Sequence, residues 1–363
     1  MEEKKIKIGI THGDINGIGY ELILKTLADV RILELCTPII YGSSKALAYH
    51  RKIMELETVN TSIINRAQEA GANRISIINS IDTEVKVDIS QSTDAAGEAA
   101  FKALEDAVRD LKEGTIDALL TAPINKQNIQ NKHFPFAGHT EYLEQSCGDG
   151  KKALTMLLSE NLRIALVTGK IPFSQVPSKL NVQELVAKLK TFRQALTQDF
   201  GLVKPKIAVL SLNPRGGETG QLGTEEQDIV RPAMKEAEKQ GVLAFGPYPA
   251  DSLFGSGNYT KYDGVLAMYY DQGLIPFKTL AMENGVIFTA GLPVVRTSPA
   301  HGVAYDIAGK NLASEQAFRN ALYLAIDVYR RRKTHRSATS NPLKKQYFEK
   351  GSDNEKLDLT AEE

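Results

Sequence analysis

The sequence predicts an α/β protein with a mostly parallel central sheet. Short apolar runs that suit buried strands alternate along the chain with longer segments whose apolar residues recur at helical spacing. Glycines stand at several of the turns between them. This strand–helix–strand rhythm is typical of a doubly wound sheet, because a helical crossover joins parallel neighbours. The length of 363 residues allows two lobes or one large domain.

The first predicted strand covers Lys5 to Ile10, where polar and apolar residues alternate. The turn after it contains Gly13, Gly17 and Gly19, and a helix is expected to begin near Tyr20. Such a turn can bring backbone N–H groups close to a ligand. Its glycine spacing is not that of the dinucleotide-binding fingerprint, so the turn alone does not identify a cofactor.

A long amphipathic helix is expected between two short strands, which cover residues 38–41 and 116–121. Ser92-Thr93-Asp94 suits the start of this helix, and Gly114 stands where a left-handed residue closes one. The apolar residues of one helical face are Phe101, Leu104, Val108 and Leu111. This part of the chain therefore predicts a helix packed on a sheet.

The rest of the chain continues the alternation. A helix is expected to open at Gly138-His139-Thr140-Glu141, where the His–Thr pair could hold a phosphate or hydroxyl oxygen. Thr224 and Gln227 form a capping-box pattern at the start of a further helix. The other expected elements are strands at 162–168, 207–212 and 265–268 and helices at 182–200 and 312–329.

The clearest functional signal follows the predicted strand at 265–268. That strand ends in a polar cluster, Tyr270-Asp271-Gln272, closed by Gly273. Ligands of parallel α/β sheets bind beyond the carboxyl ends of strands, where loops converge on one crevice. Lys278 and Arg296 follow in turns bounded by glycine and proline. We therefore expect the crevice to receive an anion, which a fixed cation can bind.

Several separated motifs occur in a fixed order along the chain. They are Thr11-His-Gly-Asp-Ile-Asn-Gly-Ile-Gly-Tyr-Glu21, Gly138-His-Thr-Glu141, Leu212-Asn-Pro214 with Gly217-Glu218, Gly223-Thr-Glu-Glu226, Gly246-Pro-Tyr-Pro-Ala-Asp251, Ala267 to Lys278, Leu292 to Ser298 and His301 to Lys310. Together they resemble the 4-hydroxythreonine-4-phosphate dehydrogenase family of vitamin B6 (pyridoxine) synthesis, which belongs to the isocitrate/isopropylmalate dehydrogenase superfamily. The resemblance runs from about residue 5 to about residue 330.

The resemblance implies a two-lobed α/β/α fold like that of isopropylmalate dehydrogenases. Residues 1–330 would form one catalytic unit of two interleaved lobes with the site in the cleft, and a homodimer would share its active sites. The implied activity is NAD-dependent oxidation of a phosphorylated hydroxy acid, 4-hydroxythreonine 4-phosphate. Two alternatives stay open. One is a dehydrogenase of 4-phosphoerythronate or phosphothreonate, and the other is a non-catalytic protein that binds a phosphorylated ligand.

The resemblance also assigns site residues. Substrate contacts are expected from His139, Thr140, Lys278 and Arg296, and acidic groups near the reacting centre from Asp251 and Asp271. The loop that resembles the family's adenosine-binding loop contributes His301, Gly302, Ala304 and Asp306. A carboxylate at position 306 would repel a 2′-phosphate, so NAD is expected rather than NADP. Ile287 replaces a substrate-contacting asparagine of the family and leaves a polar substrate group without that partner.

The family holds a divalent metal on three histidines, and those positions are occupied here by Lys170, Arg215 and Tyr270. Protonated lysine and arginine have no lone pair for a metal, so we predict no metal site. In one hypothesis Lys170 and Arg215 supply the missing charge, Tyr270 hydrogen-bonds the reacting hydroxyl, and Lys170 acts as the base. In the other, the chain binds a ligand without this chemistry.

Composition excludes several other classes of protein. The formal net charge is zero and no long basic stripe occurs, which argues against nucleic acid as a partner. No apolar run reaches the length of a membrane span, and no secretory signal is expected, so a reduced cytoplasm fits. The polar tail at 331–363 is expected to be disordered in its last part.

Overall fold

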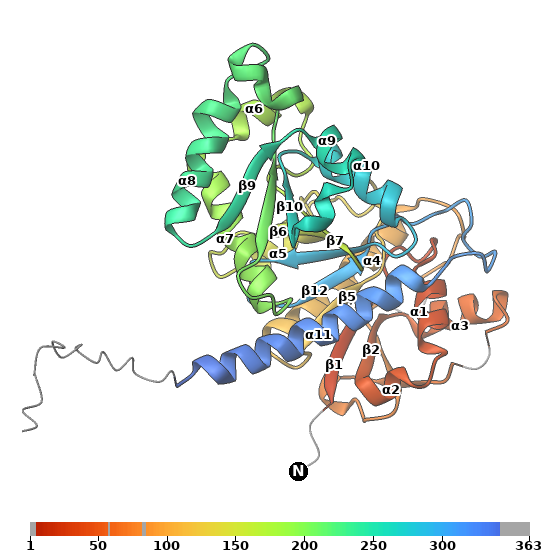
Figure 1. Cartoon of the computed structure of the whole chain (residues 1–363). Helices are drawn as coiled ribbons and strands as arrows, with labels where there is room; N and C mark the ends of the chain where they lie inside the picture. The colour runs from red at the N-terminus through yellow and green to blue at the C-terminus, as the bar shows by residue number, and fades with distance from the viewer. Residues whose placement is uncertain (1–4, 57–58, 82–84, 342–363) are drawn as a thin grey trace, which may run out of the picture.

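The computed structural model describes residues 5–56, 59–81 and 85–341 (Figure 1). Within these ranges, twelve strands form one sheet. In sheet order the strands are β3 (Thr61–Ile64), β4 (Ile75–Asn79), β2 (Cys36–Gly42), β1 (Ile6–Thr11), β5 (Ala118–Thr121), β12 (Arg296–Pro299), β11 (Val286–Ala290), β6 (Leu154–Ser159), β7 (Leu162–Leu166), β10 (Gly264–Ala267), β8 (Lys206–Leu210) and β9 (Leu243–Tyr248).

The sheet has two parallel halves that run in opposite directions. From β3 to β12 all neighbours are parallel, and so are all neighbours from β7 to β9. Between the halves, β12, β11, β6 and β7 pair in antiparallel fashion. Three successive reversals place the carboxyl ends of the two halves at opposite edges of the sheet. The predicted α/β class with a mostly parallel sheet is confirmed.

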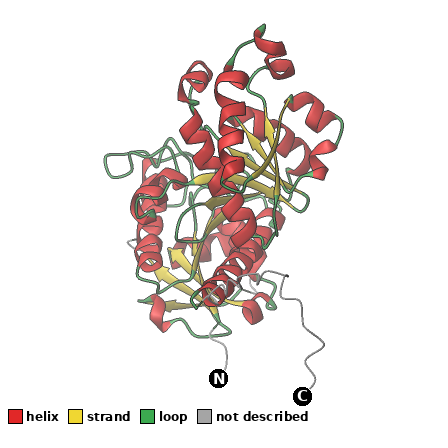
Figure 2. Cartoon of the chain, turned by 60° about the vertical axis from the view of Figure 1, so that its left-hand side comes forward, coloured by secondary structure: helices red, strands yellow, loops and turns green. Residues whose placement is uncertain are grey.

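Helices cover both faces of this sheet (Figure 2). They are α1 (Gly19–Leu27), α2 (Ile32–Leu35), α3 (Ser44–Ile53), α4 (Asp94–Lys112), α5 (His139–Cys147), α6 (Val176–Lys179), α7 (Val182–Gln198), α8 (Arg231–Lys239), α9 (Ala250–Gly255), α10 (Tyr270–Ala281) and α11 (Gln316–Thr339). None of the helices in the described ranges is long and apolar enough to cross a membrane.

Local sequence signals explain why α4 lies where the sequence predicts it. The Thr93 hydroxyl accepts a hydrogen bond from the backbone N–H of Ala96, which satisfies one of the free donors of the first turn. Gly114 closes the helix with a φ of +69°, a conformation that glycine adopts without strain. The predicted apolar face of α4 is buried against the sheet.

The polar cluster after β10 is helical, which the sequence did not indicate. Tyr270 opens α10, and Gln272 is buried, with its side chain bonded to the backbone N–H of Met268 (2.7 Å) and the carbonyl of Ser211 (2.6 Å). Gly273 lies in the first turns of the helix rather than closing a loop. A Cβ at this position would lie 2.6 Å from the Leu166 side chain, so the glycine lets α10 approach β7 closely.

Two other predicted elements differ from the structure. The capping box at Thr224 is wrong, because a π-helical turn at Glu226–Val230 precedes α8 and has no side-chain cap. The last helix does not end at residue 329 but continues to Thr339 as α11. Its basic segment includes Arg332, which is 7% exposed and pairs with Asp199 at 2.7 Å, so what reads as the start of a tail is anchored in the core.

The predicted disordered end of the tail, residues 342–363, lies outside the described residues. The interpretation of residues 1–330 as one catalytic unit of two interleaved lobes stays a prediction.

Candidate active site

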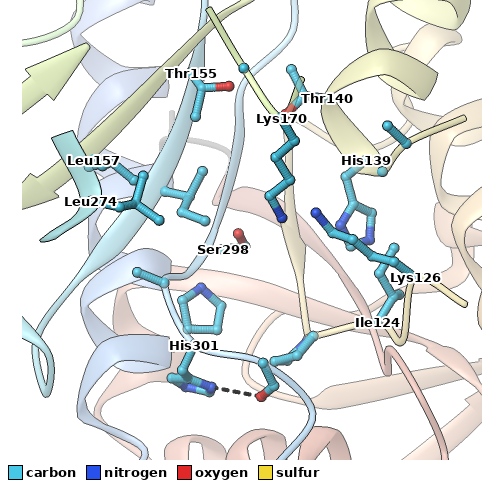
Figure 3. Close-up of a pocket in the computed structure, with 18 of the residues that line it drawn as sticks. Ile124, Lys126, His139, Thr140, Thr155, Leu157, Lys170, Leu274, Ser298 and His301 are labelled. Carbon is cyan, nitrogen blue, oxygen red and sulfur yellow. Dashed lines mark hydrogen bonds between the residues drawn. The ribbon is translucent and has the colours of Figure 1, made fainter. Parts of the chain in front are cut away.

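A pocket of about 340 Å³ lies over the centre of the sheet (Figure 3). Its walls come from strands β6, β11 and β12, from α10 and the start of α5, and from the loops that follow β5, β7 and β12. This volume is in the range of sites that bind small molecules. Segments from both parallel halves of the sheet therefore contribute to a single pocket.

The pocket lies on a face of the sheet rather than at one edge. Thr155 and Leu157 line it from β6, and Arg296 and Ser298 line it from β12, because alternate residues of a strand face the same side. Antiparallel pairing through β11 brings these strands side by side. The expected crevice at converging carboxyl ends is thus replaced by a surface that crosses the antiparallel centre.

Positive side chains predominate in the pocket lining. Lys126, Lys170, Lys278 and Arg296 face one carboxylate among the lining residues, that of Glu141. The sequence placed Lys278 and Arg296 in turns, and this is wrong in detail, because Lys278 lies in α10 and Arg296 begins β12. Both nevertheless line the pocket. The excess of positive charge suits a ligand with more than one negative group.

Arg296 is 3% exposed, and no carboxylate of the described residues lies within ion-pair distance of it. Its guanidinium donates to the hydroxyl of Thr121 from Nε (3.0 Å) and Nη2 (2.7 Å), and to the hydroxyl of Thr289 from Nη1 (3.4 Å). Burial lowers the pKa of Arg296 to about 9, against the opposing effect of Glu141. A buried cation without a counterion is costly unless a ligand supplies the anion.

Lys126 and Lys170 meet inside the pocket, with their amine groups in hydrogen-bond contact (Figure 3). The pKa of Lys126 is lowered to about 8, first by partial desolvation of its amine and then by the adjacent Lys170. Lys170 Nζ also lies 5.2 Å from the centre of the Tyr270 ring, in a cation–π contact. Two of the positions where the family has histidines thus contact each other.

His139 and His301 each bring a ring nitrogen without a partner to the pocket. The Nε2 atoms of both are buried and have no hydrogen-bond partner among the described residues. Burial lowers the pKa of both imidazoles, and for His139 the nearby Arg296 and Lys126 lower it further. Neutral imidazoles can donate or accept one hydrogen bond at these atoms, so both are open to a ligand.

Eight of the thirteen residues assigned from the sequence line the pocket: Lys170, Tyr270, His139, Thr140, Lys278, Arg296, His301 and Gly302. The other five do not line it: Arg215, Asp251, Asp271, Ala304 and Asp306. Arg215 is exposed and forms an ion pair with Glu218. Asp251, Asp271 and Asp306 are exposed, and Ala304 has a φ of +45° in the loop next to the pocket.

Lys126 and Ser298 are pocket residues that the sequence reasoning missed. Lys126 ends the segment that follows the predicted strand at 116–121, so its place after a strand was a usable signal. Nothing in the sequence indicated that its amine would meet Lys170, since 44 positions separate the two residues (170 − 126 = 44). Ser298 follows Arg296 by two positions and shares its face of β12.

The three positions that hold histidines in the family do not fit a divalent metal. Lys170 contacts another amine, Arg215 is paired with a carboxylate, and Tyr270 presents its ring to Lys170. None offers the neutral imidazole that such an ion requires. In the described ranges, no group of three or more His, Cys, Asp or Glu side chains is placed to hold a metal.

Comparison with known proteins identifies the family. Residues 34–325 match the family model described as pyridoxal phosphate biosynthetic protein PdxA. The chain is 58% identical over 359 residues to a 4-hydroxythreonine-4-phosphate dehydrogenase of Bacteroides thetaiotaomicron, covering 99% of this chain and 98% of the relative. A relative from Oceanobacillus iheyensis, 35% identical over 329 residues (90% of this chain, 98% of the relative), is named for D-threonate 4-phosphate.

A solved structure has the same fold. It is the 4-hydroxythreonine-4-phosphate dehydrogenase of Klebsiella pneumoniae, which is 31% identical and superposes with a TM-score of 0.77, covering 91% of this chain and 99% of that one. The match extends over both parallel halves of the sheet and over the pocket between them. The chain belongs to the PdxA family of pyridoxal phosphate biosynthetic proteins.

Proposed function

We propose that this protein is an NAD-dependent dehydrogenase of a phosphorylated hydroxy acid, 4-hydroxythreonine 4-phosphate, and that it works without a metal. The observation that carries the proposal is the buried guanidinium of Arg296, which faces the pocket without a carboxylate partner. The names of the relatives support the reaction type. The positive lining supports a substrate that carries both a phosphate and a carboxylate.

The anionic groups of the substrate would be held by charge-assisted hydrogen bonds. Arg296 can present its fork to a phosphate or carboxylate, and Lys278 adds a second cation from α10. His139 and Thr140 begin α5, where backbone N–H groups and the helix dipole also favour an anion. The unpartnered Nε2 of His139 can complete this set.

The contacting lysines would replace the charge that the family's ion brings. The resting pair shares one proton, so it can accept the proton of the reacting hydroxyl and stabilise the oxygen as hydride departs. Lys170 is the base proposed from the sequence, and Lys126 extends that role to a pair of amines. Tyr270 holds Lys170 through its ring and can hydrogen-bond the same hydroxyl.

The loop at 301–306 would bind NAD, which supplies the hydride acceptor when bound. His301 and Gly302 line the pocket, and the Nε2 of His301 has no partner among the described residues. A Cβ on Gly302 would meet nothing within 4 Å, so there is room beside it. We assign Ala304 to the same loop and the exposed carboxylate of Asp306 to the adenosine ribose.

We further propose a homodimer with shared active sites. Arg215, Asp251 and Asp271 do not line the pocket of their own chain, and a shared site would use them from the second subunit. We also propose a cytoplasmic location, since both cysteines, Cys36 and Cys147, are buried free thiols.

A second candidate is a dehydrogenase of 4-phosphoerythronate or phosphothreonate. It is favoured by Ile287, which places an apolar side chain on the pocket wall where the family has an asparagine, and by the Oceanobacillus relative. An apolar wall would tolerate a substrate that lacks one polar group.

Purified protein with NAD and 4-hydroxythreonine 4-phosphate is expected to produce NADH, and replacing NAD by NADP is expected to lower the rate at least tenfold because of Asp306. The assay follows nicotinamide absorbance for this substrate, D-threonate 4-phosphate and 4-phosphoerythronate in parallel. Faster turnover of either sugar acid would favour the second candidate. Binding of all three by calorimetry without turnover would refute an enzyme and support a protein that only binds phosphorylated ligands.

A further inference from the structure

The lysine pair contains one amine that is free to react. Two ammonium groups cannot donate to each other, so a hydrogen bond between Lys126 and Lys170 requires that one amine be neutral and accept. Lys170 Nζ lies over the Tyr270 ring, which favours a cation at that position. The neutral member is therefore Lys126, whose side chain points toward the end of Lys170 in the pocket (Figure 3).

The groups around Lys126 keep this arrangement. Lys170 and Arg296 face it as cations from the loop after β7 and from β12, and both lower its pKa. Glu141 opposes them from the first turn of α5, and the imidazole of His139, on the same helix, is neutral. Partial desolvation has the largest effect, and the pKa of about 8 leaves a sizeable neutral fraction near neutral pH.

We propose that Lys126 is a nucleophile that forms an imine with the keto group of a β-keto acid in this pocket and so promotes the loss of CO₂. A desolvated lysine beside another cation is an established arrangement for forming imines with carbonyl compounds. The inference rests on the proposed function only for the source of the keto acid. Oxidation of a hydroxyl one carbon away from the carbon that bears the carboxylate yields such an acid.

The steps balance without any further reagent. The lone pair of Lys126 Nζ attacks the carbonyl carbon, and Lys170 gives a proton to the resulting oxyanion and takes one from the new ammonium. Lys170 then protonates the hydroxyl, water leaves, and a protonated imine remains. The bond to the carboxylate breaks, and its electron pair moves into the imine to give an enamine and CO₂. Protonation of the enamine carbon from solvent and hydrolysis release the ketone and restore Lys126.

The pocket offers what this chemistry needs. Arg296 and Lys278 can hold the anionic groups of the acid, while Lys126 and Lys170 lie in the same lining. The imine nitrogen carries the positive charge that accepts the electrons, which is the task that a metal would perform for an enolate. Lys170 thus has a second use here, as the acid and base next to the nucleophile.

Reduction with sodium borohydride tests the proposal. The protein is mixed with acetoacetate, or with acetone as a second probe, reduced, digested and mapped by mass spectrometry, and CO₂ release is measured separately. We expect an isopropyl group on Lys126 with either probe. Lys126→Arg and Lys126→Met are expected to lower labelling and CO₂ release at least tenfold. Lys170→Met is expected to lower labelling about tenfold, because the pKa of Lys126 then rises toward its ordinary value.

Lys132→Met is the matched control, because Lys132 is exposed in the same connection between β5 and α5 and does not line the pocket. It should be labelled like the wild type. Equal labelling of the wild type and Lys126→Arg would overturn the proposal, as would adducts that keep the carboxyl group with no accelerated CO₂ release. Labelling without any NADH formation would refute the dehydrogenase alone, and turnover without labelling would refute the imine alone.

Discussion

Replacement of Arg296 by methionine is expected to lower kcat/KM about 100- to 1000-fold while the free energy of unfolding stays equal or rises. The loss follows from the removal of a buried, charge-assisted contact to the substrate, which is worth about 2–5 kcal/mol. Stability should not suffer, because the guanidinium is 3% exposed and has only two threonine hydroxyls as partners. A buried cation without a counterion is itself costly.

Arg332→Met provides the contrast for this experiment. Arg332 is also buried, but it forms an ion pair with Asp199 and donates to the carbonyls of Leu292 and Val294. Its removal leaves a carboxylate that is 2% exposed without its partner, so we expect a loss of about 3–5 kcal/mol. Urea unfolding and steady-state kinetics of both variants separate the two roles. If Arg296→Met destabilised the protein as much as Arg332→Met, Arg296 would be a structural residue and not an anion site.

Replacement of Lys170 by methionine is expected to lower kcat at least about 100-fold, because it removes both a fixed cation and a proton carrier from the reacting oxygen. Lys170 is exposed and adds little to the core, so the variant should fold. Lys170→Arg separates the two contributions. A guanidinium keeps the charge but cannot become neutral, and we expect it to restore KM but not kcat.

The kinetic readout is the dependence of kcat on substrate and pH, measured by NADH absorbance. Lys179→Met, an exposed lysine of α6, serves as the control for loss of a surface charge. Unchanged turnover of Lys170→Met would reject Lys170 as a participant in the reaction.

Local elements could be predicted from the sequence because their signals are local. The alternating residues of β1, the cap at Thr93 and the glycine at position 114 each specify a backbone conformation within a few residues. The end of α11 could not be predicted in this way. Its continuation depends on Arg332 reaching Asp199, which is 133 positions away in the sequence.

The site was predictable by residue type but not by position. Motif resemblance found Arg296, His139 and His301, whose chemistry is legible in the sequence. The antiparallel centre of the sheet could not be seen, since β11 and β12 are short and their pairing is long-range. For the same reason Lys126 was missed, and the exposed position of Arg215 was not foreseen.

The central claim is that cationic side chains occupy the place where relatives keep an ion. Elemental analysis of active, purified protein, combined with turnover before and after treatment with EDTA, tests it most directly. The account predicts far less than one transition metal per chain and the same rate with and without chelator. One tightly bound metal per chain, with activity that the chelator abolishes and the metal restores, would contradict it.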